Sequence, residues 1–347
     1  MAGCYILFME AVMKHTRINI WNKGEYSYEA AYGFEPNIRT YIHDDDEVRD
    51  CMLVVPGGGY CMVVPSEAEV VAKTFYEKGM NAFVLSYTTD ITFSIPLLNQ
   101  PLKDISRAVR LIRSRSGEFN IDPDRLVICG FSAGGHLCGS LCVHYDDVTE
   151  EDVALSKFSN RPDAAILSYP VITSGDKTHP SSIEALVGTD ASQEEKDYYS
   201  IEKNVSSDTP PCFIWQTVTD DLVPIENSYL MAAALAAKNI PHTLHAFPYG
   251  PHGLSVSNKD FYLGRHGEDY TFEQLKLATN AVRDGRGIKV SEKRTNEIIE
   301  QFFSEESPWF KEADKMDEKT MEESFENPYE DVSKWPDIAY EWLIKVI

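Results

Sequence analysis

A serine set among glycines has the spacing of a catalytic nucleophile. Residues 130–136 read Gly-Phe-Ser-Ala-Gly-Gly-His, directly after an apolar β-branched run and directly before an apolar stretch with helical spacing. A strand–turn–helix of this kind needs small residues two before and two after the serine, because the backbone turns sharply there. The motif predicts that Ser132 is the nucleophile of an acyl-transfer enzyme. The competing interpretation is a glycine-rich turn with a helix-capping serine.

A serine nucleophile needs a base to take its proton and an acid to orient that base. In the nucleophile-elbow arrangement the chain order is serine, then acid, then histidine. His252 follows the predicted strand 242–247, and Asp220 follows the predicted strand 212–217. Because α/β sites form past the carboxyl ends of parallel strands, we expect these two side chains to meet Ser132.

The acid is a choice between two adjacent residues, Asp220 and Asp221. We choose Asp220, which lies three residues before Val223-Pro224, and we expect Asp221 to cap the helix that begins at Pro224. The alternative for His252 is a histidine of a surface loop. Flanking glycines and its place after the last predicted core strand favour the catalytic role.

A tetrahedral intermediate also needs N–H donors for its oxyanion, from the residue after the serine and from the loop after an earlier strand. Residues 56–60, Pro-Gly-Gly-Gly-Tyr, follow the predicted strand 51–55 at the right place. The alternative is a flexible turn. The amides that we assign to the oxyanion are those of Gly58, Gly59 and Ala133, and we expect Tyr60 to line the acyl pocket.

Short β-branched runs alternate with longer helical stretches between residues 39 and 249, which predicts an α/β fold with a mostly parallel central sheet and helices on both faces. The predicted strands are 37–43, 51–55, 82–87, 125–129, 164–169, 212–217 and 242–247, with 17–21 as a possible antiparallel edge strand. The predicted helices are 66–78, 102–114, 134–144 and 224–238.

The chain divides into an N-terminal extension, 1–36, and a core, 37–254, that contains a polar excursion over the sheet, 172–211. An acidic, helical insertion follows at 255–332, and the final core helix lies in 333–347. The insertion is expected to be a solvated appendage. Its apolar residues Phe302, Phe303, Trp309 and Phe310 motivate the alternative of a lid or a dimerisation element, with a homo-oligomer through 255–332 as its consequence.

The composition excludes several classes of protein. The 347 residues carry a net charge of −23 and have a pI near 4.7, so nucleic acid and anionic membranes are unfavourable partners. Apolar runs are far shorter than the roughly 20 residues of a membrane span. Seven cysteines without a CxxC pair and an N-terminal run, 4–9, that makes a poor signal peptide predict a cytoplasmic protein with reduced thiols, starting at Met1 or Met13.

Metal and cofactor motifs are missing from the sequence. There is no HExxH, no cluster of cysteine and histidine, no P-loop and no dinucleotide GxGxxG at the first strand–helix turn. We therefore expect a reaction with no metal and no cofactor, in which Asp104 and the turn 122–125 are structural.

With these motifs in place, the sequence resembles the α/β-hydrolase esterases of the hormone-sensitive-lipase-like and acetyl-xylan-esterase-like group. The segments that carry the resemblance are 56–60, 120–125, 130–136, 208–211, Asp220 with 223–228, and 250–254. The resemblance implies the α/β-hydrolase fold and a serine carboxylic-ester hydrolase for short acyl esters, above all acetyl groups on sugars or xylo-oligosaccharides.

The sequence departs from the pattern of that group at two positions. Pro56 stands where many relatives have histidine. Gln216 also stands where histidine is expected, and we expect this second change to alter the wall of the pocket.

Three rival functions are open to the sequence. A prolyl-oligopeptidase-like peptidase would need a large propeller domain, for which there is no repeat. A lipase would need an apolar lid, and 172–211 is polar. The third rival is a catalytically silent binding protein on a hydrolase scaffold.

Overall fold

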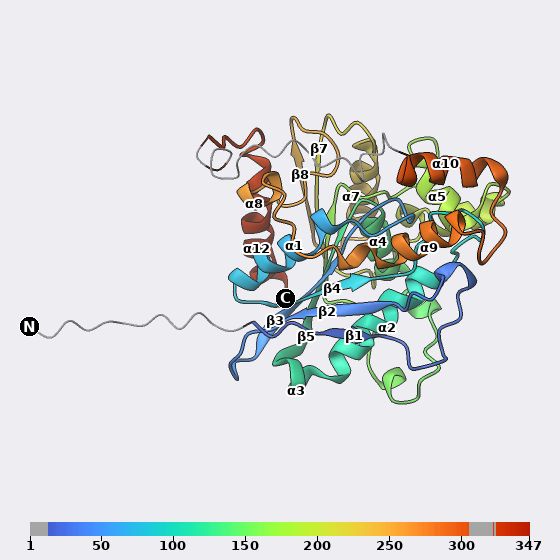
Figure 1. Ribbon diagram of the computed structural model, residues 1–347. Helices are drawn as coiled ribbons and strands as arrows, with labels where there is room; N and C mark the ends of the chain where they lie inside the picture. The colour runs from blue at the N-terminus through green and yellow to red at the C-terminus, as the bar shows by residue number, and fades with distance from the viewer. Residues whose placement is uncertain (1–12, 305–321, 323) are drawn as a thin grey trace, which may run out of the picture.

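Eight strands of the described chain form one sheet (Figure 1). Ser132, Asp220 and His252 each follow the carboxyl end of one of its strands. The computed structural model describes residues 13–304, 322 and 324–347. The strands are β1 (Arg17–Asn19), β2 (Asn37–Tyr41), β3 (Arg49–Val55), β4 (Asn81–Ser86), β5 (Ile121–Phe131), β6 (Ala164–Ser168), β7 (Cys212–Thr217) and β8 (His242–Phe247).

The order of the strands across the sheet is β1-β2-β4-β3-β5-β6-β7-β8. β1 and β2 run antiparallel to their neighbours, and every pair from β4 to β8 is parallel. β3 to β7 consist mainly of buried apolar residues, as expected for strands that are covered on both faces. The predicted α/β class with a mostly parallel sheet is confirmed, and the run 17–21 does supply an antiparallel edge strand.

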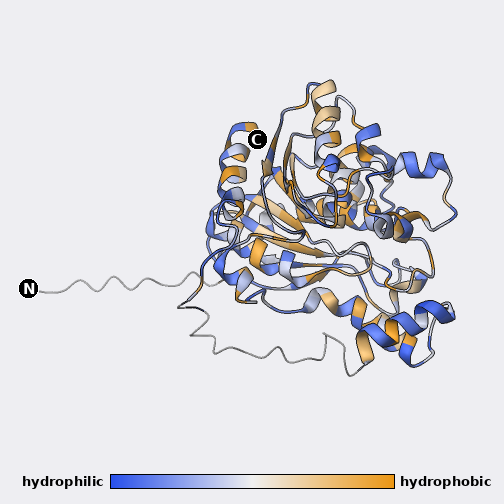
Figure 2. Ribbon diagram, turned by 90° about the horizontal axis from the view of Figure 1, so that it is seen from above, coloured by the Kyte–Doolittle hydropathy of each residue, from blue (hydrophilic) through white to orange (hydrophobic). Residues whose placement is uncertain are grey.

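Helices cover both faces of the sheet and enclose two apolar cores. One face carries α2 (Gln100–Ser114), α4 (Ala133–His144) and α7 (Glu226–Ala237), and the other carries α1 (Glu69–Glu77) and α12 (Trp335–Val346). A short helix, α3 (Ser116–Phe119), precedes β5. In Figure 2 the central strands are mainly orange, and the helices around them alternate between blue and orange stretches.

The excursion 172–211 crosses the carboxyl-terminal edge of the sheet and contains two short helices, α5 (Pro180–Val187) and α6 (Gln193–Tyr198). Ser192 and Glu195 form a capping box at the start of α6. The backbone N–H of Leu97 donates to the carbonyl of Ala185 at 3.0 Å, so the excursion is fastened to the loop that precedes α2.

The described part of the insertion 255–332 contains the helices α8 (Lys259–Tyr262), α9 (Glu273–Arg283) and α10 (Glu292–Phe303), joined by loops. Ile298 and Phe302 of α10 are buried with residues of α9 and with Ile91 of the loop after β4. Cys61 and Met62 pack against this cluster, which therefore borders the glycine loop after β3. Trp309 and Phe310, which suggested a lid or a dimer contact, lie outside the described residues.

The final helix begins at Trp335 and packs over β6 and β7. The Trp335 indole stacks on that of Trp215 at a centroid distance of 5.2 Å, so α12 packs against β7, the strand that leads to Asp220. The helices of the described segments include none long and apolar enough to cross a bilayer. The six cysteines among the described residues form no disulfide.

Candidate active site

The turn between β5 and α4 holds Ser132 in a backbone conformation that ordinary residues avoid. Its φ and ψ are 52° and −117°, in the left-handed half of the map. The N–H of Ser132 donates to Ser168 at 3.0 Å, and its carbonyl accepts from Val171 and His136. These bonds hold the strained turn, so the hydroxyl projects at the edge of the sheet.

The two glycines that flank Ser132 are required by close backbone contacts. A Cβ on Gly130 would lie 2.2 Å from the carbonyl oxygen of Gly134, and a Cβ on Gly134 would lie 2.1 Å from that of Val55. Both distances are below any real contact of a Cβ atom. The turn therefore has the sharpness that the motif predicts.

The structure brings the three predicted residues Ser132, His252 and Asp220 together. His252 Nε2 lies 2.8 Å from Ser132 Oγ, and His252 Nδ1 lies 2.8 Å from Asp220 Oδ2. The Asp220 side chain is fully buried, and that of His252 is 12% exposed. A histidine held between a buried carboxylate and a serine is oriented to accept the serine proton at Nε2.

The Asp220 carboxylate accepts four hydrogen bonds. Oδ1 accepts the N–H groups of Leu222 and Val223 at 3.0 and 2.8 Å, and Oδ2 accepts Gln216 Nε2 at 3.2 Å beside His252. The expectation that Gln216 changes the wall of the pocket is wrong, because this residue is completely buried under the acid. Gln216 orients Asp220, and Ser228 donates to the oxygen of its amide.

Asp221 does not cap a helix, in contrast to the expectation. α7 begins at Glu226, and the Asp221 side chain instead accepts the backbone N–H of His252 at 3.0 Å. Adjacent aspartates thus hold the ring and the backbone of the same histidine. Thr217 and Thr219 add hydroxyl bonds to the carbonyl of Gly250, which fastens the acid loop to the histidine loop.

The glycine loop after β3 runs beside Ser132 with backbone amides available. A Cβ on Gly57 would lie 2.9 Å from Ser132 Cβ, so this residue packs directly against the nucleophile. In the described part of the chain the N–H groups of Gly58, Gly59 and Ala133 donate no hydrogen bond, whereas that of Gly57 donates to Glu67. The glycine loop, with Gly58 and Gly59, and the first residue of α4, Ala133, thus leave unbonded the three amides that the sequence assigns to the oxyanion, and that assignment stays a prediction.

Tyr60 differs from its predicted place in the acyl pocket. Its side chain is only 1% exposed, and its hydroxyl lies 2.8 Å from His136 Nδ1 under α4. His136 Nε2 in turn contacts the carbonyl of Tyr199 in the excursion. Tyr60 therefore anchors the glycine loop to α4 through the buried contact with His136, and its ring does not line an open pocket.

His179 also lies at the site, and sequence reasoning missed it. It precedes α5 in the excursion, and its Cε1 lies 3.8 Å from where a Cβ on Gly59 would be. Burial and the nearby His252 lower the pKa of His179. The only sequence signal was its position in a segment predicted to cross the edge of the sheet.

Glu67 and Tyr169 are further residues that sequence reasoning missed. Glu67 binds the glycine loop, and the Tyr169 ring lies edge-on to the His252 imidazole at 4.8 Å between centroids. Tyr169 has a φ of 37°, and it follows β6 directly. No local pattern marks either residue, because each acts across the sheet.

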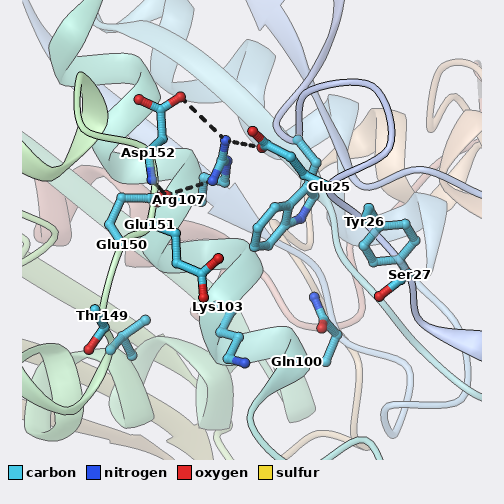
Figure 3. A pocket seen from close by; sticks show the side chains of 12 residues that line it. Glu25, Tyr26, Ser27, Gln100, Lys103, Arg107, Thr149, Glu150, Glu151 and Asp152 are labelled. Carbon is cyan, nitrogen blue, oxygen red and sulfur yellow. Dashed lines mark hydrogen bonds and ion pairs between the residues drawn. The ribbon is translucent and has the colours of Figure 1, made fainter.

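A cavity of about 500 Å³ lies beside α2, outside the site just described (Figure 3). Arg107 in its wall donates to Glu25 and Glu150 at 2.6 Å and covers the face of Trp21. These groups satisfy one another, and the lining contains none of the triad residues. Within the described ranges there is also no group of three metal-ligating side chains.

Comparison with known proteins places this site in a family. The BD-FAE family model matches residues 41–235, which is more than half of the chain and includes the glycine loop, Ser132 and Asp220. The chain belongs to the BD-FAE family. Its strand order and its structural likeness to solved hydrolases give it the α/β-hydrolase fold of esterases.

Two curated relatives are similar over part of their length. Endo-1,4-beta-xylanase B of Butyrivibrio fibrisolvens is 56% identical over 270 residues, which are 78% of this chain and 42% of that protein. An acetylxylan esterase of Xylanibacter ruminicola is 30% identical over 209 residues, which are 58% of this chain and 40% of that protein. The chain therefore spans about two fifths of each relative.

A solved structure covers a similar share of this chain. The acetyl ester-xyloside bifunctional hydrolase of Caldicellulosiruptor lactoaceticus aligns with a TM-score of 0.66 at 35% identity. The alignment covers 78% of this chain and 96% of that one. Unlike the curated relatives, this protein is matched over nearly its full length.

Proposed function

We propose that the chain is a serine carboxylic-ester hydrolase that removes short acyl groups, above all acetyl groups, from sugars or xylo-oligosaccharides. The observation that carries the proposal is the pair of 2.8 Å contacts from Ser132 to His252 and from His252 to Asp220. Family membership supports the ester, and the names of the acetylxylan esterase and the acetyl ester-xyloside hydrolase support the acetylated sugar.

The proposed reaction proceeds through an acyl-enzyme. Ser132 Oγ attacks the ester carbonyl carbon while His252 Nε2 takes its proton, and the amides of Gly58, Gly59 and Ala133 bind the oxyanion. The tetrahedral intermediate collapses, and His252 returns the proton to the departing alkoxide. Water, deprotonated by His252, then attacks the acyl carbonyl carbon. The Ser132 Oγ–acyl bond breaks, His252 returns the proton to Ser132 Oγ, and the acid leaves.

The first prediction tests both the serine and the substrate. We expect Ser132→Ala to lower kcat by about 10⁴-fold or more without unfolding the protein, because the nucleophile is lost and the buried framework is not. The measurement is acetate release from acetylated xylo-oligosaccharides beside hydrolysis of p-nitrophenyl acetate and butyrate. Circular dichroism of the variant controls for folding.

The outcomes separate the mechanism from the substrate. Loss of both acetyl activities in the variant supports a sugar acetylesterase. Serine-dependent activity on the p-nitrophenyl esters alone keeps the mechanism and rejects the acetylated sugar. Full activity of Ser132→Ala rejects the nucleophile, and with it the proposal.

No observation favours the peptidase or the lipase. The described chain contains no propeller, and the excursion 172–211 presents polar residues around α6. The two contacts that align Ser132, His252 and Asp220 disfavour a catalytically silent binding protein, since a serine that takes part in no reaction needs no base.

A further inference from the structure

A buried carboxylate that the proposed reaction does not use lies against the glycine loop, residues 56–60. Glu67 ends the short turn 65–67 before α1, and only 4% of the residue is exposed. Its Oε2 accepts the N–H of Gly57 at 2.7 Å, and its Oε1 accepts the hydroxyl of Tyr169 at 2.6 Å. Burying a carboxylate is costly even with such bonds, so its presence calls for a reason.

The hydrogen bonds around Glu67 fit its ionised form. The Tyr169 oxygen already accepts the N–H of Ser255 at 3.0 Å, so its single hydrogen is free to point at Glu67. Both carboxylate oxygens therefore accept, as an anion does. Burial raises the pKa of Glu67, and the bonds from Tyr169 and Gly57 and the nearby His252 oppose that rise.

Glu67 connects the two halves of the site. On one side Gly57 fills the space between it and the nucleophile, since a Cβ there would lie 2.9 Å from Ser132 Cβ and 3.0 Å from Glu67 Oε2. On the other side Tyr169 carries the connection to the histidine loop. Its ring packs edge-on against His252, and its oxygen holds the backbone three residues further along the chain.

We propose that Glu67 is a second positioning carboxylate of the site. It holds the backbone N–H of Gly57, next to the oxyanion glycines, and its negative charge stabilises the His252 imidazolium. This inference rests on the proposed function. When His252 takes the serine proton it becomes a cation at the edge of a buried region, where charges interact strongly. Glu67 adds to Asp220 there without touching the substrate.

Several ionisable groups surround this pair. Those near His252 are Asp220, Asp221, His179, Tyr169 and Glu67. Those near Glu67 are Tyr169, Tyr87, Cys129 and His252. Burial raises the pKa of the two tyrosines and the cysteine, so they stay neutral at working pH. A change at Glu67 alone therefore reports the effect of its charge.

The test is the pH dependence of Ser132 labelling by a fluorophosphonate probe. In this reaction Ser132 Oγ bonds to phosphorus, fluoride leaves with the phosphorus–fluorine electron pair, and His252 takes the serine proton. The rate therefore requires neutral His252 and is independent of the natural leaving group. Rates between pH 5 and 9 are compared for the wild type, Glu67→Gln, Glu69→Gln and Tyr169→Phe, with Ser132→Ala as the blank.

The labelling rate is expected to fall at low pH, on the acidic limb of the pH–rate profile, where His252 is protonated. In Glu67→Gln we expect this limb to move to lower pH by about half a unit or more, because a neutral side chain no longer favours the imidazolium. The plateau rate is expected to fall about tenfold, since glutamine satisfies only one of the two donors. Tyr169→Phe keeps the charge and loses the bridge, so we expect a slower plateau with the limb in place. Glu69→Gln is the matched control.

Glu69 is a buried carboxylate two residues further along the chain, bonded to Tyr41 and Lys73 away from the site. Its variant is expected to reproduce the wild-type profile. An unmoved limb in Glu67→Gln overturns the inference, because a merely structural role lowers the amount of labelled protein and leaves the limb in place. If that variant does not fold, an unchanged plateau in Tyr169→Phe overturns it instead.

The same data distinguish the two proposals. Labelling of the wild type that is lost in Ser132→Ala supports the activated serine whatever Glu67 does. A wild type that the probe does not label overturns the proposed function and the inference together.

Discussion

Asp220 and Asp221 are neighbours in the chain, yet they hold different atoms of the same histidine. Asp220 binds Nδ1 of the His252 ring, and Asp221 binds its backbone N–H. The first contact fixes the tautomer that leaves Nε2 free to accept a proton from Ser132, while the second only places the loop. The pair therefore separates orientation of the base from support of its backbone.

This difference predicts unequal effects of two matched substitutions. Asp220→Asn is expected to lower kcat about 10⁴-fold, because asparagine can hold the ring in the wrong tautomer and cannot stabilise the imidazolium. Asp221→Asn keeps an acceptor for the backbone N–H and is expected to lower kcat less than about tenfold. Steady-state kinetics on p-nitrophenyl acetate measure both. Equal losses in the two variants would reject Asp220 as the orienting acid.

At the scale of elements, α4 and the end of β3 approach so closely at Gly134 that no side chain fits between the two backbones. Gly134, in the first turn of α4, faces the carbonyl oxygens of Val55 and Pro56. This contact places the amino terminus of α4, with its positive dipole end, beside the glycine loop where the oxyanion would lie. Gly139, one turn and a half further on, faces only the flexible side chain of Ile201.

Alanine at these two glycines of one helix is expected to have different consequences. Gly134→Ala should destabilise the fold by about 3 kcal/mol or more, because its Cβ would lie 2.1 Å from a backbone oxygen that cannot move alone. Gly139→Ala should cost about 1 kcal/mol or less, since the side chain of Ile201 can shift while helix propensity improves. Urea unfolding measures both. A Gly134→Ala variant as stable as Gly139→Ala would contradict the close contact.

At the scale of the whole molecule, buried ionisable groups on the α2 and α4 side of the sheet act in opposite directions on stability. Burial raises the pKa of Asp104 to about 6 and lowers the pKa of His136 to about 4. The His136 contribution is present above its ordinary value of 6.5 and is lost as the pH falls toward 4. The Asp104 contribution is present below 3.8 and is lost as the pH rises through 6.

The two contributions change over the same pH range, and each is worth about 3 kcal/mol. His136→Gln, which retains only the Asp104 term, is therefore expected to gain stability relative to the wild type as the pH falls from 6.5 to 4. Asp104→Asn is expected to lose stability over the same range. The measurement is the free energy of unfolding in urea at each pH. Parallel curves for the three proteins would contradict both shifts.

The net charge and the packing of the insertion bear on the partners of the whole molecule. The charge of −23 disfavours nucleic acid and anionic membranes, and a cytoplasmic location stays a prediction. The apolar residues of α9 and α10 are buried within the same chain, against the loop that carries Cys61 and Met62. A homo-oligomer through the insertion also stays a prediction, which the mass in solution tests.

The sequence by itself determined the elements and the order of the three central residues. Strands β7 and β8 have the predicted bounds, and the final helix lies within its predicted range, because the spacing of apolar residues along one element is a local property. The turn at Ser132 is equally local, since glycines two residues away suffice for its geometry. Asp220 and His252 followed from where their loops leave the sheet.

Only the tertiary structure decided which side chains meet across those loops. It buried Tyr60 against His136, placed Gln216 under the acid and turned Asp221 to the backbone of His252. It also brought Glu67 and Tyr169, 102 positions apart, into one hydrogen bond. Sequence patterns report spacing along one element. The partner of a buried polar group is set by the packing of several elements, which no local pattern records.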